Sequence, residues 1–501
     1  MEIRCPDGGD GDRSTTYPAT HEEIDPTGML SMVANLTPWS DHNQSPRNMY
    51  QCQMGKQTMT FSLQAIHFHA DQKLYHLQTP QTPIVRTKTY TKYCMDNYPS
   101  GTNAIVAVLA YTGYDMEDTM ILNKSSVERG MCHGQIYQTE TIDLIDEGSK
   151  FEQGQRVFRR DHLDKSLNSL INPDGLPYVG QVLHPNEPYC STINQVTNSK
   201  RIYKRKGSET VMVDYVAVDV KNKNDIQKIN ICFRHPRNPI IGDKFSSRHG
   251  QKGVCSQFWP DIDMPFSGVT GMHPDLITNP HAFPSRMTIG MLLESVAAKR
   301  GSFHVKFVDA TPFSNAVRVD NGKIETKSSE SLVDELGSML RTCGFNYHGT
   351  EVLYSGVYGT ELTCEIFIGP VYYQRLRHMV SDKFRVRFTG QVDQITRQSI
   401  KGTKCGGGIR FGEMERDSML ACGAAYLLHD RLHTCSDHLI ADVCSLRGSI
   451  LTASLLRPQK RAVTSKGMET VAMPYVFRYL AAKLAAMNIK VTLQLSSGPG
   501  A

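Results

Sequence analysis

Apolar residues along the chain predict a small set of strands and helices. The short, unbroken run IVAVLAY at 105–111 is typical of a buried strand, and the alternating VMVDYVAVDV at 211–220 predicts a strand with one buried face. The segment after 111 predicts a turn followed by the start of a helix. The spacing in TIGMLLESVAAKR predicts a helix capped by Ser285. Further helices are expected at 328–341, 417–432 and 475–487. Strands and helices do not alternate regularly, so we predict a mixed α+β, multidomain protein.

Length and composition indicate a folded protein of several domains. At roughly 150 residues per domain, 501 residues predict about three units. With 40% hydrophobic and 21% charged residues, wholesale disorder, collagen and coiled coil are excluded. No apolar run approaches the roughly 20 residues of a membrane span, and the start lacks a secretory signal. The 13 cysteines form no CxxC pair, which favours reduced thiols, so we expect a soluble intracellular protein.

Charge is distributed unevenly along the chain, although the net charge is only +5. Residues 200–252 hold 13 Lys and Arg against 5 Asp and Glu, and residues 375–416 hold 10 against 4. Two basic tracts predict a polyanionic partner, with nucleic acid as the leading candidate and a solvated basic face as the alternative.

The segment GDKFSSRHGQKG is the first candidate for chemistry. Lys244 and Lys252 lie eight residues apart, with Arg248 and His249 between them and three glycines around them. Glycines let a backbone approach a polyanion closely, and lysines neutralise phosphate. The GxxxxGK[ST] spacing of a P-loop is absent. We predict a phosphate-binding loop, and an ordinary basic surface loop is the alternative.

Adjacent carboxylates, Glu117 and Asp118, follow the predicted strand in YDMEDTM. Neighbouring carboxylates ionise together most readily beside a cation, so they are candidate ligands for Mg²⁺. Capping of a helix start is the alternative and is favoured by this pair taken alone. Arg47, among amide side chains, and Arg286, just before a predicted helix, are candidate phosphate ligands or salt-bridge partners. No HExxH or GxSxG motif occurs, which disfavours those hydrolases.

Cys435 and Cys444 are the candidates for a zinc site. Two thiols separated by eight residues do not complete four ligands, and the nearby His433 and His438 fit no finger or ribbon spacing. The residues alone favour buried free thiols.

Seven segments, in this order along the chain, together resemble the second-largest subunit of multisubunit DNA-directed RNA polymerases. They are DHNQSPRNMYQCQMGKQTM, LQTPQTPIVRT, GYDMEDTMILNKSSVERG, NPIIGDKFSSRHGQKGV, ITNPHAFPSRMTIGMLLES, GPVYYQRLRHMVSDK and GGGIRFGEMERD. Within that family the sequence looks most like the RNA polymerase I form, in MYQCQMGKQTM, GTELTCEIFIGPVYYQRLRHMVSDKFRVR and PYVFRYLAAKLAAMNIKV.

The resemblance implies catalytic roles for four residues. Lys244 and Lys252 match the family's two active-centre lysines, which contact the RNA 3′ end and nearby phosphates. Glu117 and Asp118 match the acidic pair that helps to place the second Mg²⁺. The catalytic Mg²⁺ is held mainly by the largest subunit in this family, so the chain alone is expected to be inactive.

Substrate and nucleic-acid contacts are implied in the same way. Arg47 and Arg286 match the arginines that hold the triphosphate of the incoming nucleotide, and Tyr50 lies close to that substrate. Residues matching those near the RNA–DNA hybrid are Lys56, Gln57, Arg248 and His249.

The family's architecture implies a domain assignment. It comprises a disordered acidic tail (1–28), a hybrid-binding domain built around a double-psi β-barrel (29–133 and 238–365), an inserted β-rich wall (134–237), an anchor with a switch loop (366–420) and a clamp portion with a degenerate zinc ribbon (421–501). The family's ribbon uses two CxxC pairs. Here Cys444 remains, Arg447 stands in its partner's place and the second pair is absent from LLRPQKRAVTSKGMETV, so Zn²⁺ is not expected.

The function implied is synthesis of ribosomal RNA in the nucleus, in the nucleolus, by RNA polymerase I. Expected partners are the largest subunit and other core subunits, the DNA template, the RNA transcript and nucleoside triphosphates, with no membrane. Because the family's upstream half is not matched, we expect a fragment, a mis-predicted gene start or a split product. The alternatives are a truncated, non-catalytic module for assembly or nucleic-acid binding, and the polymerase II or III paralogue.

Overall fold

The computed structural model describes the greater part of the chain. The described residues are 2–3, 21–22, 25–60, 72–144, 156–160, 170–205, 207, 209–222, 225–313, 319–320, 323–324, 332–402, 405–444, 448–450 and 468–495. Most of the acidic tail expected at 1–28 therefore lies outside the described residues. The chain divides into one unit of residues 1–382 and a second of residues 383–501.

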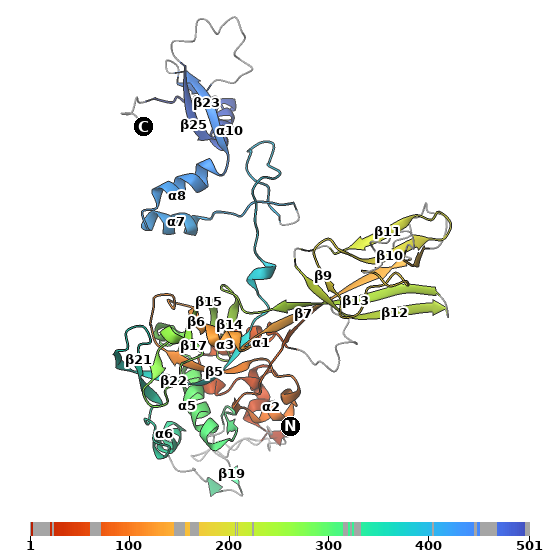
Figure 1. Ribbon diagram of the computed structural model, residues 1–501. Coiled ribbons are helices and arrows are strands. Elements are labelled where there is room, and N and C mark those ends of the chain that lie inside the picture. The colour runs from red at the N-terminus through yellow and green to blue at the C-terminus, as the bar shows by residue number, and fades with distance from the viewer. Residues whose placement is uncertain are drawn as a thin grey trace, which may run out of the picture. The chain divides into compact units, whose positions relative to one another are not determined.

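Hydrogen-bonded pairing closes six strands of the first unit into a ring, and Figure 1 labels these strands close together. Hydrogen-bonded neighbours follow the order β14, β15, β6, β17, β5 and β22, and β22 pairs back onto β14. The ring strands are β5 (Thr102–Val108), β6 (Thr119–Asn123), β14 (Lys244–Ser247), β15 (Lys252–Trp259), β17 (Leu276–Thr278) and β22 (Glu361–Arg375). The β15–β6 and β17–β5 pairs are parallel and the others antiparallel. Closure removes open edges from these strands, and their core includes Val106, Phe245 and Tyr373.

Helix α5 (Ile289–His304) packs along β22 in the ring. The approach is close because Gly369 of β22 has no side chain. A β-carbon there would lie 2.6 Å from the hydroxyl of Ser295. The helix is also covered by Trp39, Val85 and Leu336, and burial on several sides explains its largely apolar sequence.

Smaller elements surround the ring. The helices are α1 (Ser45–Gly55), α2 (Lys88–Lys92), α3 (Lys124–Glu128) and α6 (Leu332–Thr342), and short 3₁₀ turns span Pro26–Met29, Ala34–Leu36, Ser40–His42, Met95–Asn97, Asp261–Asp263, Pro280–Ala282 and Val380–Asp382. The strands are β1 (Glu2–Ile3), β2 (His21–Glu22), β4 (Val85–Arg86), β16 (Phe266–Ser267), β18 (Val308–Asp309), β19 (Val319–Asp320), β20 (Lys323–Ile324) and β21 (Thr350–Tyr354).

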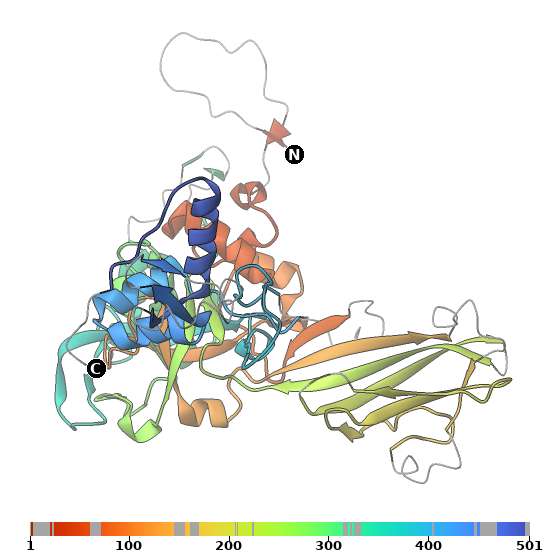
Figure 2. The same ribbon diagram turned by 90° about the horizontal axis from the view of Figure 1, so that it is seen from above.

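A five-stranded sheet extends away from the ring in both views (Figures 1 and 2). Its order is β3 (Lys73–Leu77), β7 (Gly134–Asp143), β13 (Asp225–Arg237), β12 (Val211–Asn222) and β9 (Val182–Leu183). A three-stranded sheet accompanies it, in the order β11 (Lys200–Lys204), β10 (Pro188–Asn194) and β8 (Arg156–Phe158). Ile229, Ile231 and Phe233 of β13 are buried in one cluster, while Cys232 between them is buried with Tyr137 in another, so both faces of the strand are covered there.

The second unit contains a three-stranded sheet and several helices. Strand β23 (His438–Cys444) lies between β24 (Ser449–Ile450) and β25 (Met468–Pro474). The helices are α7 (Glu413–Ala421), α8 (Ala425–His429), a π-helical turn (Asp430–Thr434) and α10 (Tyr475–Ala486). Ala441, Val443 and Met473 form its buried centre. None of the described helices in either unit has the length and apolarity needed to cross a lipid bilayer.

The prediction of a mixed α+β fold is confirmed, and several local predictions need correction. Strand β5 and helix α5 fall where the apolar patterns place them, but Thr288, rather than Ser285, is the residue at the start of α5. The segment after 111 contains strand β6 before its helix. The single helix predicted at 417–432 is broken at Gly423, whose φ is +69°. The domain assignment stays a prediction, and residue 365, one of its limits, lies inside β22.

Candidate functional site

The two lysines of GDKFSSRHGQKG begin the adjacent strands β14 and β15. Lys244 lies opposite Val254, and Lys252 lies opposite Ser246 in this antiparallel pair. That register places both lysines on one face as diagonal neighbours, a separation of roughly 7–8 Å between α-carbons. Lys252 is exposed and Lys244 is half-buried. The pair therefore presents two positive charges on the same side of the ring.

The turn between the lysines points its own charged side chains into the protein. Arg248 is 4% exposed and donates to Oε1 of Glu294 at 2.5 Å, and His249 is 0% exposed with its Nε2 2.6 Å from Oε2 of Glu294. Arg248 also donates to the carbonyl of Val85 and lies 4.9 Å from the ring centre of Tyr372. The structure thus places Arg248 and His249 beneath the lysine-bearing turn, where they contact protein rather than solvent.

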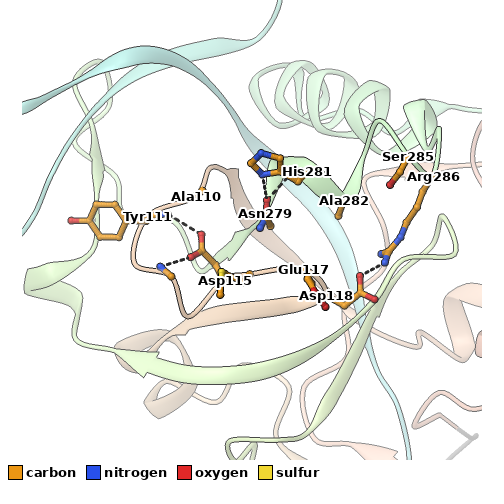
Figure 3. A pocket seen from close by; sticks show the side chains of 12 residues that line it. Ala110, Tyr111, Asp115, Glu117, Asp118, Asn279, His281, Ala282, Ser285 and Arg286 are labelled. Carbon is orange, nitrogen blue, oxygen red and sulfur yellow. Dashed lines mark hydrogen bonds and ion pairs between the residues drawn. The ribbon is translucent and has the colours of Figure 1, made fainter. Parts of the chain in front are cut away.

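The acidic pair lies on a loop after β5 that a third acid organises (Figure 3). Asp115 is 1% exposed and accepts backbone N–H bonds from Tyr111 at 2.8 Å and Gly113 at 3.0 Å. These bonds fold the loop so that Glu117 and Asp118 follow at the pocket's edge. Glu117 adopts a left-handed φ of +53°, a conformation that costs a non-glycine residue about 1 kcal/mol or more.

Asp118 forms an ion pair with Arg286 at one side of a pocket of about 620 Å³ (Figure 3). The pocket is lined by the acidic loop, which comprises residues 110–118, by the Asn279–Ala282 turn and by Ser285 and Arg286. Both side chains of the pair remain accessible, at 21% for Arg286 and 45% for Asp118. A carboxylate and a guanidinium that face an open pocket can bind a cation and an anion side by side.

The lysine pair and the acidic loop are joined by backbone contacts. The N–H of Val254 in β15 donates to the carbonyl of Asp118 at 2.9 Å. Gly253 lies so close that a β-carbon there would be 2.9 Å from the same carbonyl oxygen. The residues directly after Lys252 therefore contact the backbone of Asp118. The structure brings Lys244, Lys252, Asp118 and Arg286 into one region.

Helix α1 supplies the remaining candidates. Arg47 is half-buried and its guanidinium lies 5.4 Å from the ring centre of the exposed Tyr50. The turn at Gly250 rests on the backbone of Arg47, which ties α1 to the lysine pair. Lys56 is exposed at the end of this helix, and the Gln57 side chain lies 3.0 Å from Nε2 of His378.

Comparison with protein families identifies the chain. The family model described as RNA polymerase Rpb2, domain 6, matches residues 33–405, and that for domain 7 matches residues 407–496. The chain belongs to the Rpb2 family of RNA polymerase subunits. The family resemblance carried by the seven segments is thereby confirmed.

Curated relatives agree with the Rpb2 assignment. The chain is 69% identical to DNA-directed RNA polymerase I subunit 2 of Arabidopsis thaliana, 51% identical to RNA polymerase I subunit RPA2 of Homo sapiens and 45% identical to subunit RPA135 of Saccharomyces cerevisiae. The alignments cover 100%, 95% and 94% of this chain, and 44%, 42% and 42% of those relatives. The chain therefore spans less than half the length of these relatives.

The acidic pair of this Rpb2-family chain offers an incomplete set of metal ligands. Glu117 is exposed and Asp118 is accessible, so both carboxylates fit the oxygen chemistry that Mg²⁺ prefers. Among the described residues, no group of three His, Cys, Asp or Glu side chains could hold a metal ion. These two carboxylates alone do not complete the coordination of a Mg²⁺ ion.

Cys435 and Cys444 lie in the second unit of the Rpb2-family chain. The Cys435 thiol donates to both carboxylate oxygens of Asp430, at 3.4 and 3.5 Å, and this bond raises the pKa of Cys435. Zinc binds the thiolate, so the contact opposes coordination. Cys444 is the last residue of β23, while Arg447 and residues 451–467, where the second pair is missing, lie outside the described residues.

Sequence reasoning missed three residues that shape the site: Asp115, Glu294 and Asn43. Asp115 could have been noticed as a third acid beside Glu117 and Asp118. Glu294 interrupts the apolar run of GMLLESVAA, and a charge there signals a buried partner. No sequence signal identifies Asn43, because its contacts with His249 and Gly290 join segments more than 200 residues apart.

Proposed function

We propose that this chain forms the catalytic-centre portion of the second subunit of DNA-directed RNA polymerase I, and that it positions substrates for template-directed RNA synthesis. The supporting observation is the backbone connection between the lysine pair and the acidic loop at Asp118. Through it, cationic groups suited to phosphates lie beside carboxylates suited to Mg²⁺. The polymerase I names of the curated relatives favour this paralogue over polymerase II or III.

The lysines and arginines act by charge and position. Lys244 and Lys252 contact the RNA 3′ end and its nearby phosphates. Arg47 and Arg286 hold the triphosphate of the incoming nucleotide, and Tyr50 borders that substrate. Phosphoryl transfer gains mainly from such positioning and from neutralising charge that develops on phosphate oxygens.

Glu117 and Asp118 would hold the Mg²⁺ that accompanies the nucleotide. When bound, that ion neutralises triphosphate oxygens and orients them for displacement. Asp118 already compensates Arg286, so a Mg²⁺–nucleotide complex offers each of the two side chains a partner of opposite charge. The largest subunit is proposed to supply the ligands of the catalytic ion.

The surrounding elements receive corresponding roles. We assign the closed ring as a double-psi β-barrel in a hybrid-binding domain, the five-stranded sheet as the wall, and the segments after it as anchor and clamp. Lys56 and Gln57 line the RNA–DNA hybrid, whereas the burial of Arg248 and His249 suits support of the lysine turn. Other core subunits, DNA and RNA are the partners, and the nucleolus is the location.

The test replaces Lys252 by alanine in the full-length subunit of the assembled polymerase. Extension of RNA on a preassembled RNA–DNA scaffold is expected to slow by about a hundredfold or more, because one group that stabilises the transition state is lost. Scaffold binding is expected to change much less, since many other contacts hold the nucleic acid.

A matched control is Lys204→Ala, which removes an exposed lysine from β11 in the three-stranded sheet. Its extension rate should stay close to that of the parent polymerase. Normal extension by the Lys252→Ala polymerase would refute the catalytic proposal and favour a non-catalytic module for assembly or nucleic-acid binding.

A further inference from the structure

We infer that Glu294 is a positioning residue that fixes the turn between Lys244 and Lys252 against helix α5. The inference rests on the proposed function, because it assigns Glu294 an effect on nucleotide addition through those lysines. Glu294 itself is 1% exposed and faces neither the pocket nor solvent. Its effect is therefore exerted through the residues that it contacts.

Glu294 accepts three hydrogen bonds within the protein. Arg248 donates to Oε1 at 2.5 Å, His249 approaches Oε2 at 2.6 Å, and the backbone N–H of Tyr372 in β22 donates to Oε1 at 3.0 Å. Two of these donors are consecutive residues of the turn between the lysines. One carboxylate on α5 thus fixes both the turn and the neighbouring ring strand.

The surroundings of His249 give each ring nitrogen a separate partner. The Oδ1 atom of Asn43 accepts the N–H of Gly290 at 3.0 Å, so the Asn43 amide nitrogen faces Nδ1 of His249, also at 3.0 Å. Nδ1 must then accept, which leaves the proton on Nε2 for donation to Glu294. The buried carboxylate of Glu294 is compensated by the guanidinium of Arg248, which forms an ion pair with it.

The ionised state of Glu294 is well supported by its neighbours. Burial alone would raise its pKa, but Arg248 and His249 outweigh burial and lower the pKa of Glu294 to about 2. A glutamine at this position cannot replace the carboxylate, because its amide group would direct N–H donors at Arg248 or His249. One donor of the turn would then lose its acceptor in a buried place, which is costly.

The arrangement makes a specific kinetic prediction. Loosening the turn displaces first the lysines that flank it and the RNA 3′ end. Arg286 forms its ion pair with Asp118, which lies outside the turn, so it keeps its partner. Disturbance at Glu294 should therefore lower the maximal rate of nucleotide addition more than it changes the KM for the nucleotide.

The experiment uses the assembled polymerase with the full-length subunit carrying Glu294→Gln. Single-nucleotide addition on a preassembled RNA–DNA scaffold is measured over a range of nucleotide concentrations. We expect the maximal rate to fall about tenfold and the KM to stay within about twofold, corresponding to loss of one buried charged hydrogen bond. A rate within twofold of the parent, or parallel changes in rate and KM, would overturn the inference.

A double-variant comparison identifies the contact responsible. His249→Gln alone should also slow addition about tenfold, and the combination with Glu294→Gln should be little slower than either variant, because both break the same contact. Multiplication of the two effects would contradict positioning through His249. If the Glu294→Gln polymerase does not assemble, His249→Gln is decisive by itself, and a normal rate would refute the inference.

The control is Glu351→Gln on β21. Glu351 is also buried and ion-paired, with Lys299, but it does not contact the lysine turn. Its polymerase should add nucleotides at nearly the parental rate, and a loss equal to that of Glu294→Gln would indicate a general structural defect. Lys252→Ala distinguishes the two proposals: if it too is normal, the proposed function fails, and if it alone is impaired, only the inference about Glu294 fails.

Discussion

Gly250 lies directly against the backbone of Arg47, so that a β-carbon at position 250 would stand 2.3 Å from the Arg47 carbonyl oxygen. The glycine also has a φ of +74°, which residues with a side chain rarely adopt. Both features require glycine at this position. The close approach of α1 to the turn between Lys244 and Lys252 therefore depends on the absence of a side chain at Gly250.

Gly250→Ala should therefore destabilise the first unit by about 2–4 kcal/mol, from backbone strain and from the clash with Arg47. Urea unfolding of the chain would measure the loss. Gly271→Ala is the matched control, because Gly271 has a similar φ of +71° and no described atom lies within 4 Å of a β-carbon there. Equal losses in the two variants would show that the clash with Arg47 contributes nothing.

The Asp118–Arg286 ion pair predicts a dependence on magnesium concentration. Asp118→Asn removes one carboxylate from the proposed site, so the Mg²⁺ concentration for half-maximal nucleotide addition should rise about tenfold. A magnesium titration of the assembled polymerase would measure this shift. Glu128→Gln, which alters an exposed ion pair with Lys124 on α3, should leave the titration unchanged. An unshifted curve for Asp118→Asn would contradict the proposed role of this residue.

His235 predicts a loss of stability in mildly acidic solution. Burial, together with Arg205 and Arg237, lowers the pKa of His235 from 6.5 to about 4. Between these values the unfolded chain binds a proton that the folded chain does not. The free energy of unfolding should therefore be highest above pH 6.5 as far as His235 is concerned, and it should fall as the pH drops from 6.5 toward 4.

Urea unfolding at pH 7 and pH 5 would measure the effect of His235. His235→Gln should reduce the difference between the two conditions, since glutamine does not titrate. His184→Gln, which replaces an exposed histidine of the same region, should preserve it. The prediction fails if both variants keep the same difference as the parent chain.

Cys435 predicts that this region does not depend on zinc. The hydrogen bond to Asp430 keeps the thiol protonated, and zinc would have to displace that proton. We expect the purified chain to contain well below one zinc per chain, and its thermal unfolding to be unchanged by a chelator. Elemental analysis before and after chelation would measure this. Stoichiometric zinc that is lost together with folded structure would overturn the prediction.

The sequence predicted elements well where a single local pattern determines them. The apolar run that became β5, the alternating β12 and the helix α10 fall within a few residues of expectation. Strand β6 was missed because only five residues form it, and its burial depends on β15 and β17. The break at Gly423 was missed because apolar residues continue at helical spacing on both sides of it.

The candidate site shows the same division. The lysines, Arg286 and the acidic pair lie in recognisable motifs, so these individual residues could be named as candidates from the sequence. The interior of the site could not be predicted in this way. Glu294 contacts Arg248 and His249, which belong to a turn 45 or more residues away in the chain. Only the folded structure brings these residues together.

The pairing of Gly134 with Arg237 at the first position of β7 and the last of β13 has a consequence for folding and evolution. The two ends of a segment about one hundred residues long meet at neighbouring positions. Because these two ends are hydrogen-bonded to each other, the ring strands before and after the segment are connected as they would be by a short hairpin. The entropy cost of closing the ring therefore depends little on the number of residues between the two ends. Insertions or deletions in the outer part of that segment can therefore accumulate without changing the register of the strands that carry the lysines.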